Sequence, residues 1–95
     1  MNTEELKQHI DESGDSAYGV LLEAIPQANR RFERLTRGLY DLMQDVRKEF
    51  PDACYYSANG TVNLLLTESH DRKGRAQQFG IALNAIKLDI GGGDW

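Results

Sequence analysis

The sequence has few of the residues that cross-link a small fold or carry a chain across a membrane. Cys54 is the one cysteine among 95 residues, so no internal disulfide can form, which fits a reducing compartment. No run approaches the roughly 20 apolar residues that a membrane-spanning helix needs. The N-terminus contains Glu4 and Glu5 and no apolar segment follows it, so we expect no signal peptide. These absences predict a cytoplasmic protein with no membrane partner.

Motifs for metal binding and catalysis are also missing. Cys54, His9 and His70 are the only cysteine and histidine residues, whereas a structural zinc site takes four such ligands. Ser69-His70-Asp71 are adjacent in the chain, and adjacent residues cannot adopt the geometry of a catalytic triad. No glycine-rich phosphate loop precedes a helix. We therefore predict that the protein is not an enzyme and carries no cofactor and no metal.

Composition and length predict one globular domain, residues 1–95. Hydrophobic residues make up 40% of the chain and charged residues 27%, which is ordinary for a folded protein. The net charge of −4 argues against attraction of the whole surface to nucleic acid. A short N-terminal helix is predicted from Asn2 to Glu12, capped by Asn2 or Thr3 and ended by Gly14.

The strongest pattern is a heptad repeat of apolar residues in segment 16–50. The spacings alternate between four and three residues, and the positions, here called the seam, are Leu21, Ile25, Ala28, Phe32, Leu35, Leu39, Leu42 and Val46. A strict alternation of this kind favours packing against another helix, because a helix that packs on a sheet shows a wider stripe. Packing on the protein's own sheet remains the alternative. Pro26 interrupts the pattern and predicts one kinked helix, or two nearly collinear helices.

The length of this segment predicts self-association. A continuous helix over 16–50 would measure about 50 Å, whereas a compact domain of this size is about 30 Å across. A helix that overhangs its own domain with an apolar seam needs a partner, and closed dimers are the commonest homo-oligomers. We expect the seam to form the interface of a homo-oligomer, with a dimer favoured, while Leu22, Tyr40 and Met43 face the sheet.

After Pro51 the apolar period changes to two, which predicts strands. Segments 54–57 and 61–67 flank Asn59-Gly60, a strong signal for a tight hairpin. Residues 79–90 alternate again with a change of phase near Asn84, which favours a strand with a bulge or bend, and a helix is the alternative.

The predicted fold class is therefore α+β. It comprises a short N-terminal helix, a long kinked amphipathic helix and a three-stranded antiparallel β-meander with its apolar side on the helix. Residues 1–50 form the helical part, residues 51–90 the meander, and residues 91–95 a flexible C-terminal tail.

Two basic groups and a terminal aromatic residue are candidates for binding an anion or a partner. The first basic group lies on the back of the long helix and comprises Arg30, Arg34 and Arg37. The second lies in the loop after the hairpin and comprises Arg72, Lys73 and Arg75. The aromatic residue is Trp95, which follows three glycines and an aspartate. A solvated charged face is the alternative for the basic residues, because Asp41 and Asp45 continue it.

Two classes of function fit these features. The first is a non-catalytic interaction protein that self-associates through the long helix and binds another macromolecule, inhibiting or adapting it. Small acidic proteins without catalytic motifs are common among phage and mobile-element accessory proteins, an analogy of size and composition only. The second is a binder of small anions, nucleotides or nucleic acid that uses the two basic groups.

Overall fold

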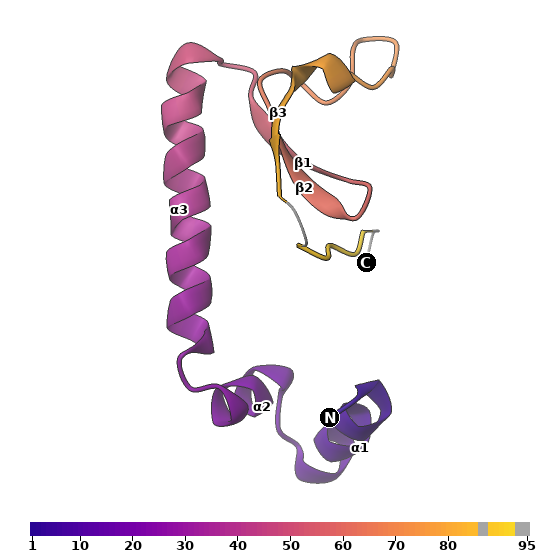
Figure 1. The fold of residues 1–95 in the computed structure, drawn as a ribbon. Coiled ribbons are helices and arrows are strands. Elements are labelled where there is room, and N and C mark those ends of the chain that lie inside the picture. The colour runs from indigo at the N-terminus through magenta and orange to yellow at the C-terminus, as the bar shows by residue number, and fades with distance from the viewer. Residues whose placement is uncertain (86–87, 93–95) are drawn as a thin grey trace. The chain divides into compact units, whose positions relative to one another are not determined.

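Figure 1 shows the fold in a computed structural model, which describes residues 1–85 and 88–92. The chain order is α1 (Thr3–Ser13), α2 (Ala17–Ala24), α3 (Ala28–Glu49), β1 (Cys54–Ala58), β2 (Thr61–Leu65), a 3-10 turn (Gln78–Gly80) and β3 (Ile81–Asn84). The predicted α+β class is confirmed. The chain divides into two compact units, Met1–Gly38 and Leu39–Trp95, and each is described by itself.

Local hydrogen bonds at both ends fix α1. The side chain of Asn2 accepts a hydrogen bond from the Glu5 amide at 2.9 Å, and the Glu5 carboxylate accepts one from the Asn2 amide at 3.2 Å. This reciprocal capping box satisfies two amides that the first turn leaves free. Gly14 ends the helix at a φ of 73°, a left-handed conformation that glycine adopts without strain.

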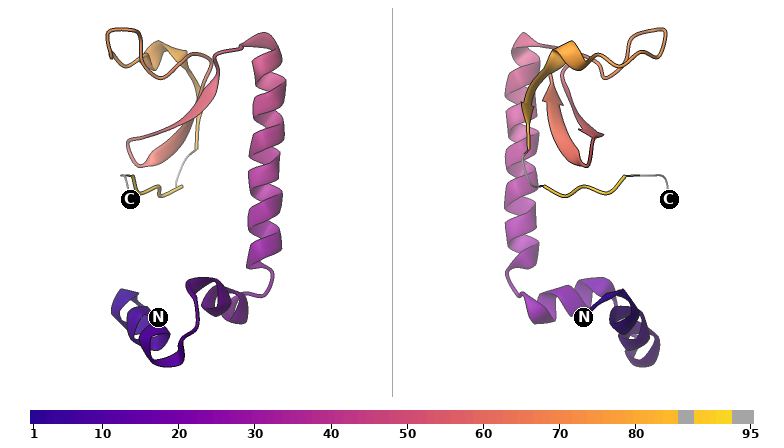
Figure 2. Two further views of the ribbon diagram at one scale, coloured as in Figure 1. Left: turned by 180° about the vertical axis from the view of Figure 1, so that it is seen from behind. Right: turned by 45° about the vertical axis from the view of Figure 1, so that its right-hand side comes forward.

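The predicted long helix is two helices, with the break at the proline. α2 begins at its cap Ser16, whose hydroxyl accepts from the Gly19 amide at 3.1 Å, and it ends at Ile25, which leaves the helical region at φ −135° and ψ 86°. Pro26 lies in the turn that follows, because its ring clashes with a preceding helical carbonyl and it offers no amide hydrogen. α2 points away from the axis of α3 at this break, so the two helices are not collinear (Figures 1 and 2). α3 alone is 22 residues, or about 33 Å, long.

The hairpin forms as predicted. β1 and β2 are antiparallel, and Ala58 pairs with Thr61, so the loop is the dipeptide Asn59-Gly60. Asn59 has a φ of 57° and Gly60 a φ of 74°. Positive φ at both residues defines a type I′ turn, whose twist matches that of the strands it joins.

The third strand is shorter than predicted. β3 pairs antiparallel with β2 over Ile81–Asn84 only, and the bulge lies in the β2–β3 pairing at Leu64/Leu65 rather than near Asn84. Phe79 belongs to the 3-10 turn and is 81% exposed. Ile86 lies outside the described residues. The three strands form one sheet in the order β1-β2-β3, and the tail residues Gly91 and Gly92 lie in no regular element.

The core of the second unit is small and joins α3 to the sheet. Its buried members are Met43, Ala53 and Leu64, with Val46, Tyr55 and Leu66 packed against them. The Tyr55 hydroxyl donates to the carbonyl of Leu39 at 2.7 Å, and burial raises the pKa of this phenol. The prediction that Met43 faces the sheet is confirmed, whereas Tyr40 is 64% exposed and the prediction for it is wrong. Leu22 belongs to α2 in the first unit and is half-buried.

Within the described residues, no helix combines the length and the apolar character that crossing a membrane requires.

Candidate functional site

The most extensive exposed apolar surface on a single element is the part of the seam on α3, here called the α3 seam. It comprises Ala28, Phe32, Leu35, Leu39, Leu42 and Val46, which all lie within one unbroken helix. At 3.6 residues per turn these positions fall in a stripe about 80° wide. Phe32 and Leu35 are 70% and 67% exposed, and Leu39 and Leu42 are 45% and 44% exposed. Such a continuous apolar stripe in contact with water is typical of an interaction surface.

The protein's own sheet covers one flank of the C-terminal half of α3. Met43 on that flank is buried, and Arg47 donates through Nε to the carbonyl of Ala53 at 2.9 Å. Val46, the last residue of the α3 seam, is half-buried against the same core. The opposite flank holds Asp45, whose side chain is 74% exposed. The α3 seam is therefore exposed from Phe32 to Leu42, whereas Ala28 and Val46 at its two ends are half-buried.

The first unit has no core of its own. No residue from Met1 to Gly38 is buried, although this segment holds Leu21 and Ile25, which are 45% and 49% exposed. A hollow of about 320 Å³ lies between α1 and α2, lined by Met1, Leu6, Ala17, Val20, Leu21 and Ala24. The two N-terminal seam residues are thus exposed as well, but they lie on α2 or at its end, separate from the α3 seam.

The basic residues on the back of α3 are exposed. Arg30, Arg34 and Arg37 lie within about 60° of one another around the helix, opposite the α3 seam. The ion pairs among the described residues are Lys48–Asp45 and Arg75–Asp71, so none of these three arginines is paired with a described residue. Their charges are available to a ligand.

The second basic group lies in a loop that Asp71 organises. The Asp71 carboxylate accepts from the amides of Lys73 and Arg75 and from Nε of Arg75, each at 2.9 Å. These hydrogen bonds, led by the one from the Arg75 amide, lower the pKa of Asp71 below its ordinary value. Gly74 completes the turn at a φ of 76°. Arg72 and Lys73 are exposed, whereas Arg75 is engaged with Asp71.

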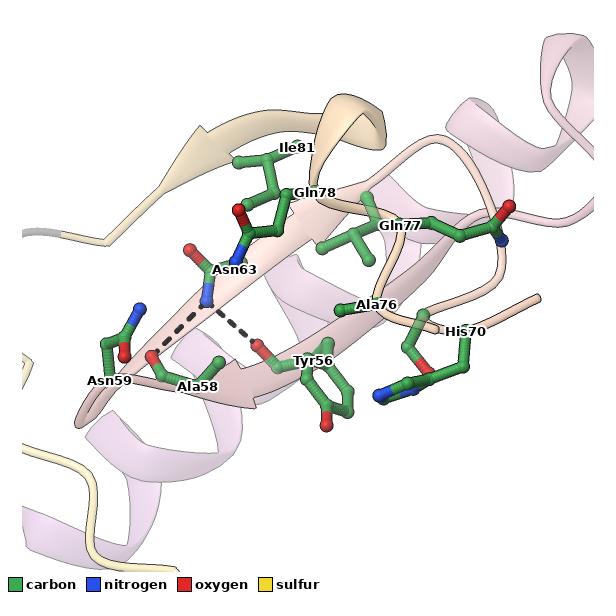
Figure 3. Close-up of a pocket in the computed structure, with 11 residues that line it drawn as sticks. Tyr56, Ala58, Asn59, Asn63, His70, Ala76, Gln77, Gln78 and Ile81 are labelled. Atoms are coloured by element: carbon green, nitrogen blue, oxygen red, sulfur yellow. Dashed lines mark hydrogen bonds between the residues drawn. The ribbon is translucent and has the colours of Figure 1, made fainter. Parts of the chain in front are cut away.

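A pocket on the sheet, lined by both polar and apolar residues, was not predicted from the sequence. The cavity has a volume of about 210 Å³, and its lining includes Tyr56, Asn63, His70 and Gln77 (Figure 3). Asn63 is 6% exposed, and its Nδ2 donates to the carbonyls of Tyr56 and Ala58 at 3.2 and 3.5 Å. The signal in the sequence is this asparagine within the apolar run of β2. Its hydrogen bonds stabilise the hairpin, which accounts for the residue without a ligand.

The residues considered for catalysis have structural partners. Ser69 Oγ lies 3.0 Å from Nδ1 of His70, and the His70 ring packs edge-on against Tyr56 at 5.6 Å. The third residue of the adjacent trio, Asp71, bonds to its own loop. Cys54 is half-buried and donates through Sγ to the carbonyl of Thr67 at 3.6 Å. Among the described residues, no three His, Cys, Asp or Glu side chains come together in a way that could hold a metal ion.

Trp95, the remaining candidate for partner binding, lies outside the described residues. Comparison of the chain with models of protein families, with characterised proteins and with solved structures finds no match. The surfaces described above are therefore the features of the molecule that bear on its function.

Proposed function

We propose that this protein is a non-catalytic interaction protein that self-associates through the α3 seam and binds another macromolecule, which it inhibits or adapts. The observation that carries this proposal is the exposure of Phe32, Leu35, Leu39 and Leu42 in one stripe of a single helix. Apolar surface of this kind is stabilised when a complementary surface removes it from water. The strict heptad spacing favours a helix as that surface.

The lack of a core in residues 1–38 supports the same proposal. A segment of about 40 residues without disulfides or metal seldom folds alone, and isolated helices as short as α1 and α2 are marginal in water. Residues 28–37 of α3 belong to this segment and contribute the two most exposed side chains of the α3 seam. A second copy packed there would supply apolar contacts that one chain does not provide.

A buried charge tests the proposed interface. Leu39→Asp should dissociate the oligomer, because self-association would place an unpaired carboxylate in a desolvated site. Tyr40→Asp is the matched control, since Tyr40 is the next residue, is 64% exposed and lies off the seam. Sedimentation velocity should show a smaller particle for the first variant only. Equal sedimentation of both variants and the parent, with helical content unchanged by circular dichroism, would place the interface elsewhere.

We include a role as a phage or mobile-element accessory protein in this proposal only because such proteins are similar in size and composition. Affinity capture with the parent and the Leu39→Asp variant, followed by mass spectrometry, would identify the macromolecular target. Retention of a target by the parent but not by the variant would show that binding depends on self-association.

A second candidate function is the binding of a small anion, a nucleotide or nucleic acid. It is favoured by the exposure of Arg30, Arg34 and Arg37, which have no ion-pair partner among the described residues. Arginine presents a planar array of donors that suits phosphate. Salt separates the two functions, because electrostatic binding weakens steeply as ionic strength rises and an apolar interface does not.

A further inference from the structure

We infer that two copies of the chain pack their α3 helices antiparallel, with a two-fold axis passing beside Gly38. The inference rests on the self-association proposed above and adds its geometry. It predicts which residues meet, and in particular that Arg31 of each copy pairs with Asp45 of the other.

The apolar positions of α3 form complete layers in this arrangement. In an antiparallel pair, seam residues meet when their numbers add to a constant, here 74, because one helix runs up while the other runs down. On the flank that holds positions 31, 38 and 45, facing residues add to 76, because contacts on that flank are offset from the seam layers by two. The register centred on α3 pairs Leu35 with Leu39, Phe32 with Leu42, and Ala28 with Val46, each pair occurring twice by symmetry. The central layers contain the four most exposed residues of the α3 seam. Val46, half-buried in its own chain, falls at the outer end where contact matters least.

The charges of α3 are complementary only when the helices are antiparallel. Residues 28–37 contain four arginines and one glutamate, and residues 39–49 contain three acidic and two basic residues, so the first half has net charge +3 and the second −1. Antiparallel packing sets the positive half of each helix against the negative half of the other. Electrostatic complementarity of this kind specifies the orientation of an interface.

Arg31 and Asp45 are placed to pair across the axis. Both lie on the same flank of the α3 seam, and each is seven residues from Gly38. A two-fold axis brings this flank of one helix beside the same flank of the other, so Arg31 faces Asp45 twice. The flank is open, because the sheet contacts Met43 and Arg47 on the other side. Lys48 occupies only Oδ1 of Asp45, at 3.2 Å, which leaves Oδ2 for an arginine.

Gly38 marks the centre of the arrangement. Glycine destabilises a helix interior relative to alanine, so its presence in the middle of α3 calls for a reason. Within the chain there is none, since nothing described lies within 4 Å of where its Cβ would be. At the two-fold axis the missing side chain lets the two helix backbones approach closely.

A parallel pair has none of these features. In a parallel pair each seam residue packs against the same residue of the other copy. A residue that flanks the seam meets the residue five positions later in the other helix. Arg31 would then meet Thr36 of the other copy, and Asp45 would meet Phe50. No ion pair forms, and the two positive halves lie side by side.

Charge reversal distinguishes the two orientations. We expect Arg31→Glu and Asp45→Arg each to weaken self-association about tenfold, because each sets like charges together twice. Mixing the two variants should restore it, since the heterodimer retains one native pair and gains one reversed pair. Sedimentation equilibrium of each variant and of the equimolar mixture measures this. Arg34→Glu and Asp41→Arg are the controls, because they make the same charge changes on the outer face of α3.

The possible results separate this inference from the proposed function. A mixture that associates more tightly than either single variant, with no such rescue between the controls, supports the antiparallel pair. A dimeric parent whose variants show no cross-rescue overturns the orientation and leaves self-association standing. A parent that stays monomeric overturns both.

A cross-link provides an independent test. In a Cys54→Ala background, Gly38→Cys places two thiols beside the proposed axis, where a short thiol-reactive reagent should join them within the dimer. Arg37→Cys in the same background is the control, because its side chain lies on the back of the helix. Gel mobility under denaturing conditions reports the product. Cross-linking of Gly38→Cys no faster than of Arg37→Cys contradicts the inference when sedimentation shows that the Gly38→Cys variant is still dimeric, whereas loss of the dimer in this variant only supports the close approach at Gly38.

Discussion

Phe32→Ala should weaken self-association strongly while leaving the chain folded. Phe32 is 70% exposed and belongs to no buried cluster, so its removal opens no cavity in the monomer. Full burial of a phenylalanine side chain contributes roughly 1.5–3 kcal/mol, and the exposed fraction scales this to about 1–2 kcal/mol. A dimer contains two copies, so we expect a loss of about 2–4 kcal/mol. That loss corresponds to a rise in Kd of roughly 30- to 1,000-fold.

The assay is sedimentation equilibrium of parent and variant over a concentration series. Tyr40→Ala is the matched control, because Tyr40 is a similarly exposed aromatic residue of the same helix, at 64%, but lies outside the seam. The control should change the Kd by less than about threefold, as surface substitutions usually contribute within 0.5 kcal/mol. Equal effects of the two substitutions would refute the assignment of the α3 seam as the interface.

Three further predictions concern the second unit and the basic residues. Gly60→Val should lower the melting temperature by several degrees in a calorimetric scan, because a branched residue is strained at a φ of 74° and a domain of this size loses roughly 4–8 °C per kcal/mol. Asp71→Asn should reduce stability to urea at neutral pH. The folded pKa of Asp71 lies below its ordinary 3.8, so the stability that the ionised carboxylate contributes is present above that value and is lost as the pH falls through the folded pKa. Plots of unfolding free energy against pH for parent and variant should therefore converge in that acidic range. If the basic residues bind a phosphate ligand, Arg34→Glu with Arg72→Glu should abolish binding to a fluorescent oligonucleotide without changing the oligomer, and undiminished, salt-independent binding would eliminate that function.

The features of the fold that were predictable depend on a few neighbouring residues. The Asn2 cap, the Gly14 stop and the Asn59-Gly60 turn each follow from the conformation that one or two residues prefer, and the structure has all three. Pro26 marked the interruption of the helix for the same reason. The heptad spacing indicated the amphipathic helix, because its period is a property of the helix itself.

The features that were not predictable depend on contacts between distant residues. Pro26 alone does not say whether a helix bends or ends; the turn at Ile25 depends on the backbone hydrogen bonds around it, such as the one from the Ala28 amide to the Ile25 carbonyl at 3.0 Å. Tyr40 and Met43 are both off-seam apolar residues, and only the position of the sheet decides that Met43 is buried. β3 ends at Asn84, although the Ala85 amide still donates to the Val62 carbonyl at 2.9 Å, and the apolar pattern alone does not locate this end.

The candidate site was predictable in its residues and not in its extent. The sequence identifies the seam from Leu21 to Val46, but the break at Pro26 separates its first two members from the α3 seam. The packing of Val46 against Met43 and the sheet removes part of the other end. The surface left for a partner therefore centres on Phe32, Leu35, Leu39 and Leu42.

The central claim is that the α3 seam joins two copies of this chain, and the mass of the parent protein in solution tests it most directly. One chain weighs 10.7 kDa. Sedimentation equilibrium at micromolar concentrations should give a mass that rises with concentration towards twice that value. A mass that stays at 10.7 kDa across the whole concentration range would contradict the claim.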